Sequence, residues 1–199
     1  MKNVIFDFGN VLIRWRPYAA LHMHFSSEAE MLACFDQIDF FGWNAEQDRG
    51  RSWEEGLAAA ERDHPDHAHI FHTYANGLDA AHGERVPGMS DLIEALHRRG
   101  VGLFGLTNAA EASFEAVKKT APEIGYMRDV VVSSREALIK PSPEIFELCL
   151  SRNGIRAAET LFVDDSAANC RGAEAMGIQA HLFTDAATLE ADLRAHGLL

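Results

Sequence analysis

Short apolar runs alternate with longer stretches of helical periodicity over most of the chain. Residues 89–99, for example, carry their apolar side chains at helical spacing, and Gly100 marks the end of that helix. The pattern predicts strands at 3–7, 101–106, 129–133, 160–164 and 178–182, and helices at 89–99, 111–119, 143–153, 167–176 and 187–195. Strands that alternate with helices predict an α/β fold with a doubly wound, Rossmann-type parallel sheet.

Residues 14–86 interrupt this alternation. They contain several helical stretches rich in Ala, Glu, His and aromatic residues, and no convincing strand. We therefore predict a core domain formed by residues 1–13 and 87–199, with a helical domain inserted at 14–86. The alternative is an ordinary long helical connection, but a span of this length needs a packed core of its own.

Polar residues follow the ends of several predicted strands. Asp7 ends the first strand, and Thr107-Asn108 follow the second. Lys140-Pro141 come after a loop beyond the third, and Asp164-Asp165 end the fourth, with Asn169 one helical turn later. Because ligands bind beyond the carboxyl ends of the strands in open α/β sheets, these residues are candidates for one shared site.

The order Asp, Thr-Asn, Lys-Pro and Asp-Asp resembles the haloacid-dehalogenase-like (HAD) hydrolase superfamily. The resemblance covers essentially the whole chain. The first motif, Asp-x-Gly-Asn-Val-Leu, is most similar to the phosphatase subgroup that includes α-glucose-1-phosphate phosphatases. The resemblance implies that the helical insertion is a cap domain, which closes over the site and selects the substrate.

The carboxylates of these motifs suggest a nucleophile and a metal site. Asp7 is the proposed nucleophile, because a carboxylate can attack phosphorus to form an aspartyl-phosphate. Three clustered carboxylates repel unless a cation compensates them, and hard oxygen ligands suit Mg²⁺. We expect the metal at Asp7, the Gly9 carbonyl and Asp165, with Asp164 nearby or also ligating. Alternatively, the acidic pair only caps the helix that begins near Ser166.

The remaining motif residues are expected to hold the phosphate. Thr107 and Asn108 offer a hydroxyl and a backbone N–H at a strand-to-helix turn, and Lys140 offers a point charge. We assign Thr107 and Lys140 to catalysis as well, and Asn10 to substrate binding. Asn169 is expected to support the acidic loop from behind by hydrogen bonding. Helix capping and solvated loop positions are the alternative explanations.

Gly9 departs from the superfamily's usual pattern. Most of its phosphatases carry a second Asp two residues after the nucleophile, which protonates the leaving group and then activates water. Such acid–base help is worth ~10²–10⁴-fold. Either the leaving group needs little help here, or the acid comes from the cap or from a metal-bound water. Gly9 is alternatively a turn glycine that needs an unusual backbone angle.

Within the cap, residues 43–50 mix aromatic and polar side chains ahead of a helix. We assign Trp43, Asp48 and Arg49 to substrate binding. Arg14, Trp15 and Arg16, near the hinge, are further candidates for substrate contact, although Trp15 and Trp43 are equally compatible with a plain cap core. Four cap histidines match no standard zinc spacing, and we interpret them as a solvated helix face: His64, His67, His69 and His72.

Composition narrows the classes of partner. The chain has 199 residues and a formal net charge of -12, which argues against nucleic acid and anionic membranes. Cys34, Cys149 and Cys170 show no metal-like spacing; we expect reduced thiols in a cytosolic protein, with Cys149 and Cys170 in the core. We expect no signal peptide and no membrane helix.

The expected function is that of a Mg²⁺-dependent phosphomonoesterase acting on a small phosphorylated metabolite, expected to be a sugar phosphate. Two alternatives stay open. A 2-haloacid dehalogenase shares the nucleophile but needs no metal, and in those enzymes the loop of Asp164-Asp165 lacks the acidic pair. A catalytically weak HAD-like binding protein is suggested only by Gly9.

Overall fold

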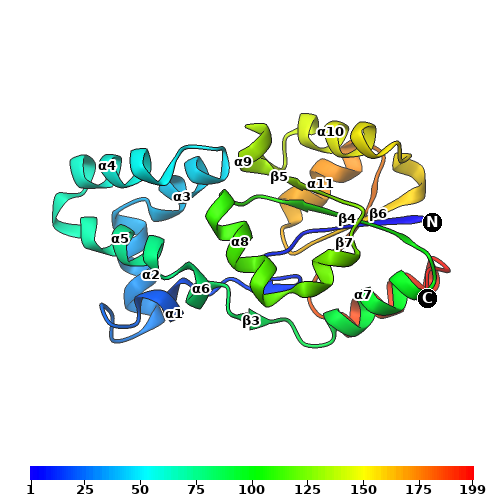
Figure 1. Cartoon of the computed structure of the whole chain (residues 1–199), viewed down its shortest axis with the longest axis horizontal. Coiled ribbons are helices and arrows are strands. Elements are labelled where there is room, and N and C mark those ends of the chain that lie inside the picture. The colour runs from blue at the N-terminus through cyan, green and yellow to red at the C-terminus, as the bar shows by residue number, and fades with distance from the viewer.

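Five parallel strands form the central sheet of the protein in this computed structural model, which describes all of residues 1–199 (Figure 1). The strand order is β5-β4-β1-β6-β7. The strands are β1 (Asn3–Phe6), β4 (Gly102–Thr107), β5 (Asp129–Val132), β6 (Thr160–Asp164) and β7 (Gln179–Leu182). The sheet confirms the predicted α/β class, and each strand lies within two residues of its predicted bounds at either end.

Helices cover both faces of the sheet, because successive side chains of a buried strand point to opposite faces. In β1, Val4 and Phe6 pack into one cluster, which includes apolar residues of three helices: α7 (Met89–Arg98), α8 (Glu111–Thr120) and α12 (Ala186–Ala195). Ile5 packs into the other cluster, with α10 (Pro143–Asn153) and α11 (Ala167–Ala175). Cys149 and Cys170 are buried, as predicted.

The segment between β1 and α7 is helical and has a hydrophobic cluster of its own. Its helices lie together at one end of the molecule (Figure 1). They are α1 (Pro17–Leu21), α2 (Glu28–Gln37), α3 (Phe40–Asp48), α4 (Trp53–Asp63), η1 (Pro65–His67), α5 (Ala68–Asn76) and α6 (Leu78–Ala81). Aromatic rings dominate the cluster, and those of Phe35 and Phe40 stack with centroids 3.7 Å apart. The boundaries at 14 and 86 remain a prediction. We refer to this helical segment as the cap.

One short strand pair in the 14–86 region was not predicted. β2 (Ile13–Arg14) pairs antiparallel with β3 (Glu84–Arg85), so the two chain crossings between sheet and cap run side by side. Two residues are too few to show an alternating pattern, and both residues of β3 are exposed. The sequence therefore contained no signal for this pair.

The remaining elements are short: η2 (Pro122–Tyr126), α9 (Ser133–Glu136) and η3 (Ala157–Glu159). None of the helices is both long enough and apolar enough to cross a bilayer.

The sheet places the candidate residues at the carboxyl ends of its strands, next to the cap. Phe6 of β1 is in register with Gly105 of β4 and Val163 of β6, so the three strands end side by side. Both chain termini lie at the other end of the molecule (Figure 1). The strand ends of β1, β4 and β6 therefore face the cap.

Candidate active site

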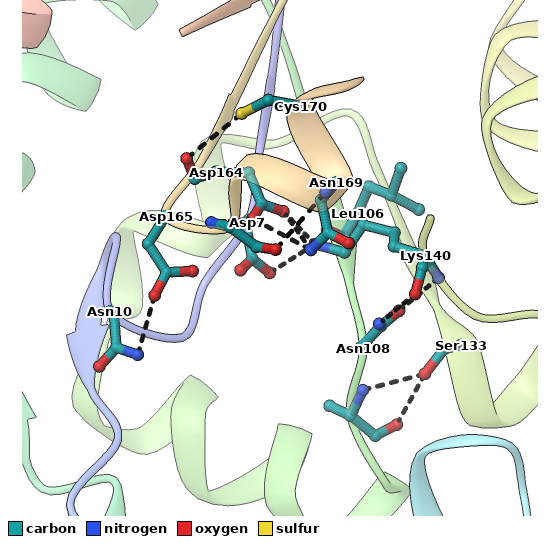
Figure 2. Close-up of polar contacts among 12 residues, drawn as sticks. Asp7, Asn10, Leu106, Asn108, Ser133, Lys140, Asp164, Asp165, Asn169 and Cys170 are labelled. Carbon is teal, nitrogen blue, oxygen red and sulfur yellow. Dashed lines mark hydrogen bonds and ion pairs between the residues drawn. The ribbon is translucent and has the colours of Figure 1, made fainter. Parts of the chain in front are cut away.

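A buried lysine joins two carboxylates at the ends of β1 and β6 (Figure 2). The Lys140 ammonium lies 2.9 Å from Asp7 Oδ1 and 2.7 Å from Asp164 Oδ2. It also donates to the Leu106 carbonyl at 2.8 Å. Its three protons therefore have three acceptors, and the lysine has no hydrogen left for solvent.

Burial and neighbouring charges shift the pKa values of Lys140 and Asp7 in this cluster. Burial alone would lower the pKa of Lys140, but the carboxylates of Asp7 and Asp164 outweigh burial and raise it above its usual value. Burial raises the pKa of Asp7 to about 7, with Lys140 opposing the shift and the Asp164 carboxylate adding to it. A divalent cation beside Asp7 would favour its charged form, which is the form that attacks phosphorus.

The two acidic residues at the end of β6 have different surroundings. Asp164 is fully buried, and each of its oxygens accepts two hydrogen bonds, from Lys140, Asn169 and the Ser166 backbone N–H. Asp165 accepts only one hydrogen bond, from the Asn10 amide at 3.1 Å, and it lines a cavity. Asp165 is thus the freer ligand, whereas Asp164 holds Lys140 and its own loop in place.

The three carboxylates can hold a metal ion. One oxygen from each of Asp7, Asp164 and Asp165 lies within 4.8 Å of the others. Carboxylate oxygens at the mouth of a cavity, with room for water, are the donors that Mg²⁺ prefers. The four cap histidines form no such group with one another or with acidic residues.

The loop after β1 corrects one interpretation of Gly9. Its backbone angle is not positive, and Asn10 instead adopts the left-handed conformation, with a φ of 55°. The Asn10 amide is used at both ends, donating to Asp165 and accepting from the Trp15 backbone N–H at 3.1 Å. A Cβ on Gly9 would meet nothing within 4 Å. The conformation of this turn therefore does not require a glycine at position 9.

Thr107 and Asn108 lie at the end of β4 and both line the cavity. The Asn108 side chain pairs with the backbone of Lys140, accepting from its N–H at 2.9 Å and donating to its carbonyl at 3.0 Å (Figure 2). Because the Asn108 side chain holds the loop of Lys140 in place, Asn108 can contribute only its backbone N–H to a phosphate cradle. The Thr107 hydroxyl has no hydrogen-bond partner within the protein.

A cavity of about 280 Å³ lies between the strand ends and the cap. Its core-side lining includes Asp7, Gly9, Asn10, Thr107, Asn108 and Asp165. The cap contributes Trp15, Asn44, Asp48, Tyr74 and His82, and Ala109, Ser113 and Val117 complete it. Lys140, which is 3% exposed, lies behind the wall rather than in it.

The three cap residues assigned to substrate binding lie in different places. Asp48 lines the cavity. Trp43 does not: it is buried in the cap core and donates from Nε1 to the Gly56 carbonyl at 2.7 Å. Arg49 does not either, since its exposed guanidinium pairs with Glu46 at 2.6 Å. The structure thus corrects the assignments of Trp43 and Arg49, because Trp43 packs into the cap core and Arg49, which follows α3, pairs with Glu46 at the surface.

Sequence reasoning missed three cavity residues of the cap: Asn44, Tyr74 and His82. The Tyr74 hydroxyl accepts from the Trp15 indole at 3.0 Å, and His82 Nδ1 lies 2.8 Å from the Leu78 carbonyl. Each belongs to a helical stretch whose pattern does not distinguish a cavity wall from a cap core. Only the packing of the cap on the sheet reveals them.

Comparison with known proteins identifies the family. The model of the haloacid dehalogenase-like hydrolases matches residues 1–177. The sesquiterpene phosphatase astK of Aspergillus oryzae is 25% identical over 196 residues, covering 97% of this chain and 95% of that protein. Phosphoglycolate phosphatase of Pseudomonas fluorescens is 27% identical over 132 residues, covering 65% of this chain and 48% of that protein.

A solved structure shares the fold. It is a point variant of a HAD family enzyme from Bacteroides thetaiotaomicron, in complex with magnesium and inorganic phosphate. It is 20% identical, with a TM-score of 0.72 over 93% of this chain and 95% of that one. The family match covers far more than half of the sequence, and it agrees with the order of motifs and with the sheet that gathers them. The chain therefore belongs to the haloacid dehalogenase-like hydrolase family.

Proposed function

We propose that the protein is a Mg²⁺-dependent phosphomonoesterase that works through an aspartyl-phosphate on Asp7. The observation that carries this proposal is the placement of Asp7, which lines the cavity while Lys140 holds one of its oxygens at 2.9 Å. The other oxygen is left for a reacting phosphorus. The two curated relatives described above are both phosphatases, which supports the same reaction class.

Each core residue has a definite task in this reaction. Asp7 attacks the phosphorus, and Lys140 keeps the carboxylate oriented and offsets the charge of Asp164 beside it. The Thr107 hydroxyl can donate to a phosphoryl oxygen. Asp7 and Asp165, together with the Gly9 carbonyl, would hold Mg²⁺, which would offset the negative charge that the carboxylates and the phosphate bring together.

The substrate that we propose is a small sugar phosphate, as expected of the α-glucose-1-phosphate phosphatase subgroup. The cap side of the cavity supports this, because Asn44, Asp48 and His82 are polar groups that can pair with hydroxyls. The rings of Trp15 and Tyr74 add apolar surface beside them. A volume of about 280 Å³ suits a small metabolite rather than a polymer end.

The competing reaction is removal of halide from a 2-haloacid. It uses the same nucleophile, but it has no need for the exposed Asp165 carboxylate at the mouth of the site. One pair of assays separates the two: phosphate release from p-nitrophenyl phosphate with and without Mg²⁺, and chloride release from 2-chloropropionate. We expect Mg²⁺-dependent phosphate release alone, and chloride release in excess chelator would overturn the proposal.

The substrate class is tested by a screen of phosphorylated metabolites. The panel should contain sugar 1-phosphates, sugar 6-phosphates, phosphoglycolate and prenyl phosphates, at equal concentration with saturating Mg²⁺. We expect the largest kcat/KM on a sugar phosphate. A preference of tenfold or more for a prenyl phosphate or phosphoglycolate would refute the sugar assignment while leaving the phosphatase activity intact.

A further inference from the structure

The proposed reaction needs a proton donor, because an alkoxide is a poor leaving group. Gly9 has no side chain to supply one. A donor that belongs to the protein itself, rather than a metal-bound water, must face the cavity in which the phosphate ester binds. Only five of the lining residues can titrate: Asp7, Asp48, Tyr74, His82 and Asp165.

Four of these five are unsuitable. Asp7 is the nucleophile, and Asp165 faces the metal position. Burial raises the pKa of Tyr74, so its phenol holds the proton more tightly than an ordinary tyrosine does. Burial lowers the pKa of His82, and its Nδ1 proton is directed to the Leu78 carbonyl, so the neutral ring has no proton on Nε2.

Asp48 is the remaining residue, and the structure holds it firmly. It lies at the end of α3, where its Oδ1 accepts from the Ala110 backbone N–H at 3.0 Å. Its Oδ2 lies 3.3 Å from the Asn44 amide, and its backbone carbonyl accepts from the Ser133 hydroxyl. Both Ala110 and Ser133 belong to the core. Asp48 is thus a cap residue whose position is fixed by the core.

The surroundings of Asp48 also suit proton transfer. Burial raises its pKa to about 7, against the opposing effects of the Ala110 hydrogen bond and of the charges of Arg49, the next residue, and of Lys140 in the core. The Asn44 amide, the Ser133 hydroxyl and the Tyr74 phenol, its other polar neighbours, carry no charge at pH 7. A carboxylic acid with a pKa near the working pH can both release and recover a proton.

We propose that Asp48 is the catalytic general acid that protonates the leaving group, given the phosphatase reaction proposed above. As Asp7 attacks, the bond between phosphorus and the ester oxygen breaks, and its electron pair takes the Asp48 proton to form the free alcohol. Water then attacks the phosphorus of the aspartyl-phosphate and gives a proton to the Asp48 carboxylate. The bond between phosphorus and the Asp7 oxygen breaks, and its electron pair returns to the Asp7 carboxylate. Inorganic phosphate leaves, and both aspartates return to their starting states.

The first test compares leaving groups in Asp48→Asn, which keeps the shape and the hydrogen-bond acceptor toward Ala110. On an alkyl phosphate we expect kcat/KM to fall by ~10²–10⁴-fold. On p-nitrophenyl phosphate, which needs no proton, we expect a rapid burst of about one p-nitrophenolate per enzyme molecule and then slow turnover. Glu46→Gln removes an exposed carboxyl of the same helix, and we expect it to leave kcat/KM unchanged on both substrates.

The outcomes separate this proposal from the proposed function. If the unaltered enzyme releases no phosphate from either substrate, the phosphatase function itself fails. If it does, and Asp48→Asn slows the alkyl substrate and the p-nitrophenolate burst equally, Asp48 has only a structural role and the proposal is overturned. An unchanged rate on the alkyl substrate would overturn it as well.

A second variant tests whether a carboxyl group is what Asp48 provides. Gly9 lines the same cavity, and a side chain there has free space around its Cβ. We expect the double variant Asp48→Asn, Gly9→Asp to have a kcat/KM on alkyl phosphates at least tenfold higher than that of Asp48→Asn alone. In the unaltered enzyme, it should add little. No recovery in a double variant that shows the p-nitrophenolate burst would contradict the assignment.

The pH profile gives a third readout. For the unaltered enzyme, the alkyl-to-aryl ratio of kcat/KM should fall about tenfold per pH unit above pH 7, because the acid form of Asp48 is lost there. Taking the ratio cancels the ionisation of the phosphate group. In Asp48→Asn the ratio should be low and flat, and a falling ratio in that variant would contradict the proposal.

Discussion

At the scale of single residues, the site depends on how neighbouring carboxylates are made unequal. Asp164 is fully hydrogen-bonded and buried, Asp165 is nearly free and exposed, and Asp7 shares one oxygen with Lys140. Sequence position alone cannot separate Asp164 from Asp165. The difference arises because Asp164, the last residue of β6, is hydrogen-bonded to Lys140 and Asn169, whereas Asp165, just beyond the strand, lines the cavity.

This inequality predicts different responses to the two substitutions. Asp165→Ala should raise the Mg²⁺ concentration needed for half-maximal activity at least tenfold with a modest loss of stability, because it removes a metal ligand. Asp164→Ala leaves the buried Lys140 short of one partner and should cost about 3–5 kcal/mol of unfolding free energy. Activity titrated with Mg²⁺, together with urea unfolding, measures both. Equal metal dependence would contradict the assignment.

The raised pKa of Asp7 predicts a pH-dependent stability of the metal-free protein. The folded protein holds this proton up to about pH 7, whereas the unfolded chain releases it near pH 3.8. Folding therefore gains stability below pH 4 from this carboxyl, and the gain is lost as pH rises through 7. Asp7→Asn should remove this contribution. In chelator, its Tm relative to the unaltered protein should rise between pH 5 and 8, and a constant difference would refute the shift.

At the scale of elements, the strand ends bring the chemistry together, and the alternation of apolar runs and helical stretches predicted them. The Asp7, Thr107 and Asp164 positions follow directly from that pattern, because parallel strands end on one edge. The contributions of Asn44, Tyr74 and His82 could not be predicted, since they depend on how helices pack. The β2–β3 pair could not be predicted either, because each strand has only two residues.

The turn after α3 brings the cap into close contact with the core. Gly50 has a φ of 107°, and a Cβ there would lie 2.8 Å from the Ser134 carbonyl. Gly50→Ala should therefore displace the turn that carries Asp48, lower stability by more than ~1 kcal/mol and raise KM. Gly154, with a φ of 60° and no atom near its Cβ, is the matched control. Gly154→Ala should cost ~1 kcal/mol at most and leave KM unchanged. Similar KM values for both variants would contradict this.

At the scale of the whole molecule, the cap and the sheet have separate hydrophobic clusters and meet across one cavity. The cap packs around its own aromatic cluster, and the sheet has a core on each face. In the proposed reaction the core supplies the nucleophile, the lysine and the metal ligands, whereas the polar side chains of the cap that line the cavity would face the rest of the substrate. Of the three cap residues assigned to substrate binding, the structure places Asp48 in this cavity, and Trp43 belongs instead to the aromatic cluster.

In the proposed mechanism Asp7 carries the phosphoryl group, and the Asp7→Asn variant examines this role without changing the size of the side chain. The amide keeps the size of the side chain but cannot attack phosphorus. We expect the variant to fold, with circular dichroism like that of the unaltered enzyme, and to show p-nitrophenyl phosphate turnover at least ~10³-fold lower with saturating Mg²⁺. Turnover by folded Asp7→Asn within tenfold of the unaltered enzyme would contradict the account.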